Sequence, residues 1–171
     1  MIFRLSVWIV MIFGGIFGGY YIDSILFKDI HNNLIFHFIS LLFGVIVLVL
    51  VMKISKNTGR TLAKYGRKGE LKRLETNVFV QEGVYQYMRH PMHLGLLFFP
   101  LAFALLVGSP SFIIFIVPSE IVMMLIMIKL FEEPEAIGKF EDEYRTYMKK
   151  TPWFCFKIKC LKELFKEVDK E

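Results

Sequence analysis

The stretch from Leu34 to Met52 constrains this chain most, because it consists almost entirely of Leu, Ile, Val and Phe. It contains no Asp, Glu, Lys or Arg and is long enough to cross the hydrocarbon core of a bilayer as a helix. In lipid every backbone polar group must be bonded within the protein, which favours helices. The composition agrees, since 55% of the 171 residues are hydrophobic, which is too apolar for an ordinary soluble domain.

Three further apolar stretches predict additional spans, at roughly Leu5 to Tyr21, Leu94 to Val107 and Phe112 to Phe131. We interpret the first as an uncleaved span, because no small-residue cleavage site follows it. The third span in chain order is short, and its Pro100 predicts a kink. The turn sequence GSPS (Gly108 to Ser111) joins the last two spans into a helical hairpin. The sequence therefore predicts an all-α integral membrane protein with about four transmembrane helices.

Four glycines in the first span have the spacing of a helix-packing motif: Gly14, Gly15, Gly18 and Gly19. Small residues four apart let another helix approach closely, so we expect close packing here. The alternative is that they simply make the helix flexible.

Lysine and arginine residues predict how the chain lies in the membrane. They are abundant between the second and third spans and after the fourth, and the GSPS turn has none. The positive-inside tendency then places the N-terminus, the central loop and the C-terminus in the cytoplasm. We expect a multi-pass protein, in the plasma membrane of a prokaryote, with its site on the cytoplasmic side. The net charge of +5 lies beside apolar segments and does not indicate nucleic-acid binding.

The two cysteines, Cys155 and Cys160, are expected to be free thiols in a reducing compartment. No histidine or second cysteine pair lies near them in the sequence, so no metal site is expected.

A cytosolic amphipathic helix is predicted after the fourth span, ending before Pro152. Phe140, Tyr144 and Tyr147 lie on one face of it at i, i+4 and i+7. The tail after it carries apolar residues among lysines and is expected to lie along the membrane surface. The predicted regions are N-terminal spans with a basic loop (1–76), a catalytic region containing the hairpin (77–154) and a basic amphipathic tail (155–171).

Two polar clusters border the hairpin on the same predicted side. Arg89, His90 and His93 precede its first span, and Glu132 and Glu133 follow its second. Because the connecting turn is short, the two clusters should be neighbours in space. They form either a functional site or an ion pair that locks the hairpin, and topology alone favours neither.

The segments GVYQYMRHPMHLG and EEPEAIGKFEDEYRTYMKKTPWF resemble the C-terminal half of the isoprenylcysteine carboxyl methyltransferase family, within a wider group that includes phospholipid methyltransferases. The resemblance covers about Asn77 to Phe154. Three positions depart from the family pattern: His93 replaces a tyrosine, Ala136 a leucine and Glu141 a glycine. Family members often carry an arginine, associated with the substrate, about one helical turn before the two glutamates. In this chain Lys129 lies near that position and no arginine does. These departures bear on the substrate more than on the cofactor.

The resemblance implies that S-adenosylmethionine binds at the cytosolic mouth of the hairpin. Carboxylates suit its cationic groups, so Glu132 is the first candidate for its charged end. Arg89 and Glu133 are the catalytic candidates, with Arg89 orienting an anionic group. The cofactor-binding candidates are Phe79, Val80, Tyr85, His90, Pro91, Met92, His93, Leu94, Gly95 and Glu132.

The implied activity is transfer of a methyl group to a lipophilic or lipidated acceptor that arrives through the membrane lipids. A carboxylate acceptor, as in an isoprenylcysteine, is favoured over a lipid amine, because a carboxylate is already ionised and needs no general base. Glu120, inside the fourth span, lies either at a functional position or near the far interface. The alternatives are an NADPH-dependent reductase similar to sterol reductases and a non-catalytic helical membrane scaffold.

Overall fold

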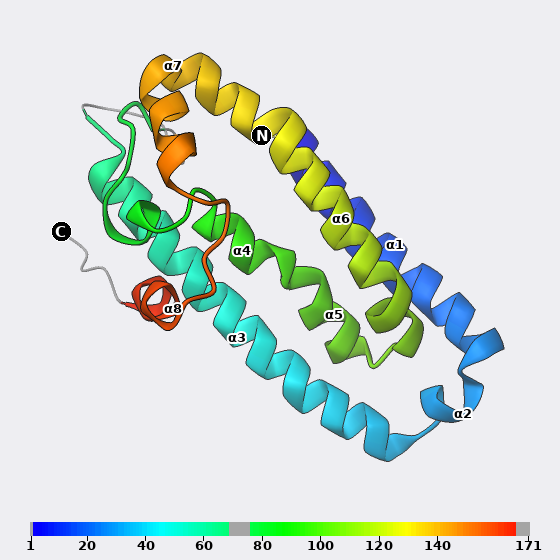
Figure 1. Ribbon diagram of the computed structural model, residues 1–171. Coiled ribbons are helices and arrows are strands. Elements are labelled where there is room, and N and C mark those ends of the chain that lie inside the picture. Colours follow the sequence, from blue (N-terminus) through cyan, green and yellow to red (C-terminus); the bar gives the residue numbers. More distant parts are fainter. Residues whose placement is uncertain (1, 69–75, 167–171) are drawn as a thin grey trace. The chain divides into compact units, whose positions relative to one another are not determined.

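The computed structural model describes residues 2–68 and 76–166, and these residues form helices and no strands (Figure 1). The helices in chain order are α1 (Ile2–Leu26), α2 (Lys28–His31), α3 (Leu34–Tyr65), the 3₁₀ turn η1 (Gly83–Gln86), α4 (Pro91–Leu97), α5 (Phe99–Val107), the π-helical η2 (Phe112–Ile116), α6 (Val117–Met127), the π-helical η3 (Ile128–Glu132), α7 (Glu133–Lys150) and α8 (Ile158–Phe165). The predicted all-α class is confirmed. Residues 167–171 of the predicted tail lie outside the described residues.

Three helical runs are long and apolar enough to cross a membrane: Ser6–Leu26, Leu34–Tyr65 and Phe112–Lys150. The apolar run Pro91–Val107 is shorter, and it is interrupted at Phe98 between α4 and α5. Pro100 explains the interruption, because proline lacks an amide hydrogen and clashes with the carbonyl four residues earlier. The third of the four expected spans is therefore a shorter, kinked run.

The helix after the hairpin turn is longer than the sequence suggests. The expected fourth span and the amphipathic helix join into one helical run, Phe112–Lys150. Both prolines in this run, Pro118 and Pro134, are preceded by a π-helical segment, η2 and η3 respectively. Local widening of the helix accommodates the hydrogen bond that each proline cannot make, so the chain continues as a helix.

The chain forms two compact units. The first comprises Met1–Val51 and Leu96–Met127, and the second comprises Met52–Gly95 and Ile128–Glu171. Large apolar side chains are exposed along the helices of the first unit, for example Leu34 at 82% and Phe38 at 71%. In a water-soluble protein such surfaces would be a liability, whereas they suit a helix that faces lipid.

Within the first unit, α1 packs closely on η2 (Figure 1). A methyl group added at Gly15 would overlap the ring of the fully buried Phe112, and one added at Gly19 would overlap the Ser109 hydroxyl. A methyl group at Gly14 would meet nothing within 4 Å. The expected close approach is confirmed at two of the four glycines.

The hairpin turn of the first unit is tied to α1 by a buried carboxylate. Asp23 is 0% exposed, and it accepts hydrogen bonds from the Ser109 hydroxyl at 2.5 Å, the Ser111 amide at 2.8 Å and the Ser111 hydroxyl. Gly108 ends α5 with a φ of +66°, a left-handed conformation that favours glycine. Glu120 lies on the buried face of α6, where one of its carboxylate oxygens has no hydrogen-bond partner.

The second unit has a core made by segments that are distant in the sequence. Its buried members are Ile54, Val80, Val84, Tyr85, Met88, Leu94, Cys160 and Leu164. The end of α3, the η1 turn, the start of α4 and α8 therefore pack together. Above them α7 changes direction at Glu141, whose φ of 47° and ψ of −122° are not helical (Figure 1).

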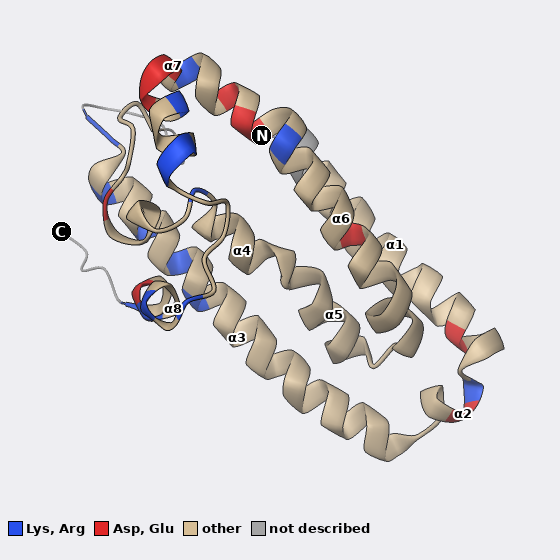
Figure 2. Cartoon of the chain, viewed as in Figure 1, with Lys and Arg blue, Asp and Glu red and all other residues tan. Residues whose placement is uncertain are grey.

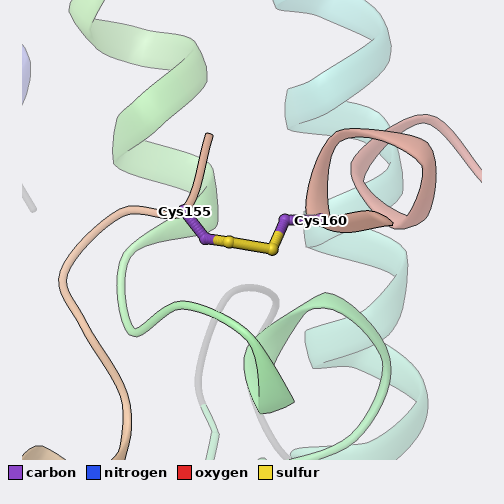
Figure 3. The surroundings of a disulfide bond; sticks show 2 residues. All are labelled: Cys155 and Cys160. Atoms are coloured by element: carbon purple, nitrogen blue, oxygen red, sulfur yellow. A yellow bond between two sulfur atoms is a disulfide. The ribbon is translucent and has the colours of Figure 1, made fainter. Parts of the chain in front are cut away.

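Cys155 and Cys160 form a disulfide in the structure, with their Cα atoms 5.9 Å apart (Figure 3). The expectation of free thiols is therefore wrong. The chain turns back after Phe154 to begin α8, and this turn brings the two cysteines within the ordinary span of a disulfide. Cys160 is 3% exposed, so little of it is accessible to a reducing thiolate.

Candidate functional site

The segment with Arg89 and His90 is a short connection between η1 and α4 in the second unit. Its backbone is held by the residues that follow α7: the Arg89 amide donates to the Pro152 carbonyl at 2.9 Å and the His90 amide to the Trp153 carbonyl at 3.2 Å. Gly83 begins η1 with a φ of +59°, which favours glycine at this position. The backbone of Arg89 and His90 is therefore held in place by the chain that follows α7.

The side chain of Arg89 forms a buried ion pair with Glu133. Its Nη2 lies 2.9 Å from Glu133 Oε1, and both side chains are 8% exposed. Its Nη1 also donates to the Met148 carbonyl at 3.0 Å. The expectation that the glutamates and the Arg/His cluster are neighbours in space is thus confirmed.

His90 contacts the same carboxylate, with Nε2 3.4 Å from Glu133 Oε1. Burial, then His93 and then Arg89 lower the pKa of His90 to about 3. The imidazole is therefore neutral near neutral pH, and the contact is a long hydrogen bond from Nε2–H to the carboxylate rather than an ion pair. This fixes the tautomer of His90.

Glu132 faces a different partner from its neighbour Glu133. Its Oε1 lies 3.9 Å from His93 Nε2, and about a quarter of each side chain is exposed, 25% for Glu132 and 23% for His93. The two glutamates lie where the π-helical η3 gives way to α7. Successive helical residues point about 100° apart, so one carboxylate is buried with Arg89 and the other lies at the surface with His93.

Tyr147 is a residue of the site that the sequence analysis placed only on a helix face. Its hydroxyl donates to the carbonyls of Tyr85 and, at 3.2 Å, of Met88. It thereby fixes the backbone immediately before Arg89 against α7. The available signal was its spacing from Tyr144 in the segment EEPEAIGKFEDEYRTYMKKTPWF. Spacing alone does not reveal a hydrogen bond to a distant carbonyl.

The other predicted site residues have different surroundings. Val80, Tyr85 and Leu94 belong to the buried apolar core, where burial and then Tyr147 raise the pKa of Tyr85. Pro91 and Gly95 are also buried.

Two predicted residues keep part of their surface. Met92 is half-buried, with its methyl group beside Gly59. Phe79 packs its ring at 5.1 Å from the rings of both Phe140 and Tyr147. The side chains with surface left for a ligand are therefore chiefly those of Phe79, Met92, His93 and Glu132.

The Nε–H donor of Arg89 is buried and has no hydrogen-bond partner in the structure. A buried donor left unpaired is costly. The site thus combines an unused cationic donor with a partly exposed carboxylate on Glu132, which suits a ligand that carries both a negative and a positive group.

Residues 35–143 match the family model for phospholipid methyltransferases, and the match spans more than half of the chain. The chain belongs to the phospholipid methyltransferase family. The match begins near the start of α3 and ends within α7, so it includes both polar clusters. No curated protein and no solved structure matches the chain. The predicted resemblance to this group of membrane methyltransferases is confirmed.

Membership in the phospholipid methyltransferase family, together with the apolar helices, makes this protein a membrane methyltransferase. The family match covers the connection that carries Arg89 and His90 and the helices that carry Glu132 and Glu133. It assigns a class of reaction, while the acceptor of the methyl group is a separate question.

Proposed function

We propose that this protein transfers a methyl group from S-adenosylmethionine to a lipophilic acceptor, with the cofactor held between Arg89 and Glu132. Two observations in a chain of a methyltransferase family carry the proposal: the buried Nε of Arg89 has no hydrogen-bond partner, and the carboxylate of Glu132, the residue before the Glu133 that pairs with Arg89, is partly exposed. Members of this family generally use S-adenosylmethionine. The proposal therefore joins a family property to a feature of these particular side chains.

The residues fit the charged groups of that cofactor. Its carboxylate would accept a hydrogen bond from Arg89 Nε, the donor that has no partner within the protein. Its ammonium or sulfonium group suits the carboxylate of Glu132. When bound, the cofactor supplies an electrophilic methyl group on sulfur, which a nucleophile attacks in line.

The work of the protein in such a displacement is alignment and exclusion of water. Glu133 holds Arg89 in one orientation, and the neutral His90 steadies the same carboxylate. Tyr147 holds the backbone before Arg89 through the carbonyls of Tyr85 and Met88. These buried contacts make Arg89 a rigid donor.

We infer that the acceptor is a carboxylate on a lipophilic molecule, such as an isoprenylcysteine, rather than a lipid amine. A protonated amine needs a base to release its lone pair. Neither of the two buried groups beside Arg89 supplies that base, because His90, with a pKa near 3, binds a proton too weakly at neutral pH and Glu133 is paired with Arg89. A carboxylate acceptor needs no such group.

The acceptor class is tested by adding S-adenosylmethionine with a tritiated methyl group to reconstituted protein. A prenylated cysteine with a free carboxylate is supplied in one arm and phosphatidylethanolamine in the other. We expect base-labile label, released as methanol, in the first arm only. Label that resists base and appears only in the second arm would overturn the carboxylate assignment and retain the methyltransferase.

We further propose that the site faces the cytoplasm of a prokaryotic cell. By sequence position, every Lys and Arg except Arg4 and Lys28 falls in the ranges of the second unit, which carries the site. Figure 2 shows many of the described ones in blue on the end of α3, on α7 and on α8. An excess of Lys and Arg is typical of cytoplasmic segments. A cysteine introduced at the exposed Lys68 should react with a membrane-impermeant maleimide only after cells are opened. Labelling in intact cells would reverse the orientation.

A further inference from the structure

Helix α8 has an apolar surface that the protein does not cover. Cys160 and Leu164 point into the core of the second unit and are 3% and 1% exposed. Ile158 and Phe165, on another side of the helix, are 74% and 38% exposed, and Phe156 just before the helix is 68% exposed. A short helix with two apolar sides therefore buries only one of them.

Charged residues border this exposed side. Lys162 and Lys166 follow it around the helix, and Lys157 lies between Phe156 and Ile158 in the sequence. Between Phe156 and Lys166 the chain has four lysines, at positions 157, 159, 162 and 166, and one acidic residue, Glu163. A shallow hollow of about 560 Å³ lies on the same side, lined by Ile158, Leu161, Lys162, Glu163, Phe165 and Lys166. An apolar stripe edged by lysines is the pattern of a helix at an anionic membrane surface.

The position of α8 along α3 agrees with that pattern. The apolar stretch of α3 ends at Met52, and Lys53 and Lys56 follow it. Leu164 of α8 shares a buried cluster with Ile54, and its carbonyl accepts a hydrogen bond from Asn57 Nδ2 at 3.4 Å. In Figure 1 α8 is seen end-on beside the C-terminal part of α3, so the two helices cross. α8 thus meets α3 where a membrane-spanning helix would leave the hydrocarbon.

The disulfide restricts how the apolar residues are presented. It joins Cys155 to Cys160 and closes a loop with the sequence FKIK, in which apolar and basic residues alternate (Figure 3). Because Cys160 is anchored in the core, the loop is held next to α8. Phe156 and Ile158 are exposed in this fixed arrangement.

We propose that α8 and its disulfide-closed loop bind the surface of an anionic membrane. Ile158, Phe165 and Phe156 enter the boundary between headgroups and acyl chains, and Lys157, Lys162 and Lys166 contact the lipid phosphates. The lysine border favours an anionic lipid surface over a second protein, because the core of a protein interface is depleted of lysine. This inference stands apart from the proposed methyl transfer and concerns a different surface.

The test is fluorescence quenching by lipids brominated near the top of the acyl chain. Ile158→Trp is placed in a chain with Trp8→Phe and Trp153→Phe and reconstituted in phosphatidylcholine with about one quarter phosphatidylglycerol. Asp142→Trp, at a fully exposed side chain of α7 away from α8, is the matched control. We expect at least about two-fold stronger quenching for Ile158→Trp than for the control. Equal quenching, or emission typical of water at both positions, would overturn the proposal.

Charge is tested in the same reporter chain with Lys162→Gln and Lys166→Gln combined. We expect phosphatidylglycerol to increase quenching of the parent reporter and to have a clearly smaller effect on the double variant, which keeps only Lys157 of the three lysines. Quenching that is independent of phosphatidylglycerol in both chains would refute the lipid-phosphate contacts. If Ile158→Trp lowers the melting temperature, Phe156→Trp, in the exposed loop, serves as the reporter with the same expected result.

Discussion

Replacing Glu133 with glutamine should destabilise the protein strongly, because it leaves the positive charge of Arg89 buried without its partner. The two side chains are each 8% exposed, and their closest atoms are 2.9 Å apart. Glutamine keeps the shape of the side chain and can still contact His90. The variant therefore isolates the effect of the charge from that of packing.

The magnitude follows from the distance and the burial. At 2.9 Å two unit charges attract by about 6 kcal/mol when the effective dielectric constant is about 20. Desolvation offsets part of this attraction, and removing one member of a buried pair costs about 3–5 kcal/mol. At roughly 2–4 °C per kcal/mol for a chain of this size, Glu133→Gln should lower the melting temperature by about 6–20 °C.

The assay is thermal unfolding in detergent at one protein concentration, at pH 7. The matched control is Asp142→Asn, which removes an exposed partner of Arg145 (N–O distance 3.9 Å) and should leave the melting temperature unchanged. A double replacement of Arg89 and Glu133 by Met and Leu should recover most of the loss, since it removes both buried charges. Glu133→Gln melting within 2 °C or so of the wild type would refute the buried-pair reasoning.

Three further changes test other parts of the structure by the same melting assay. Gly15→Ala should destabilise the first unit by about 1–3 kcal/mol through overpacking on the buried Phe112 ring, whereas Gly14→Ala should be neutral or slightly stabilising. Equal effects at the two glycines would contradict the close approach of α1. Glu141→Gly should raise stability by about 1 kcal/mol, because Glu141 has a positive φ of 47° that glycine adopts without strain; no gain would mean that this strain is not present. His90 is neutral in the folded state down to pH of about 3, while an unfolded histidine binds a proton near pH 6.5. The unfolded state therefore holds more protons between these values, and stability should fall as the pH drops through this window, by at most about 1.4 kcal/mol per pH unit from this group. His90→Gln should show a shallower fall, and identical pH profiles for the two proteins would contradict the burial of a neutral imidazole.

The sequence predicted the helices and the meeting of the two polar clusters because both follow from strong constraints. A long apolar stretch has few alternatives to a helix in a membrane. A hairpin with a short turn brings residues at its open ends together whatever the details of packing, and Arg89 and Glu133 are 2.9 Å apart in the structure. Which of the two neighbouring glutamates pairs with Arg89 was not predictable from the sequence. The answer depends on the π-helical η3 segment before Pro134, which sets the direction of each side chain.

Other features depend on contacts that leave little mark in a single sequence. Tyr147 reaches two carbonyls more than fifty residues away in the chain, and its helical spacing reveals only that it faces inward. The disulfide was missed because a cysteine pair in a basic tail gives no sign of the turn that brings the sulfurs together. Glu141 replaces the family glycine and was noted as a departure, yet its positive φ becomes visible only where α7 bends.

We propose above all that Arg89 and Glu132 hold S-adenosylmethionine. The most direct measurement is calorimetric titration of the detergent-purified protein with S-adenosylhomocysteine, beside the variants Glu132→Gln and Asp142→Asn. We expect saturable binding to the wild type, equal binding to Asp142→Asn and at least about tenfold weaker binding to Glu132→Gln, equivalent to roughly 1.4 kcal/mol. Folded wild-type protein that binds no S-adenosylhomocysteine, or a Glu132→Gln variant that binds as tightly as the wild type, would contradict this proposal.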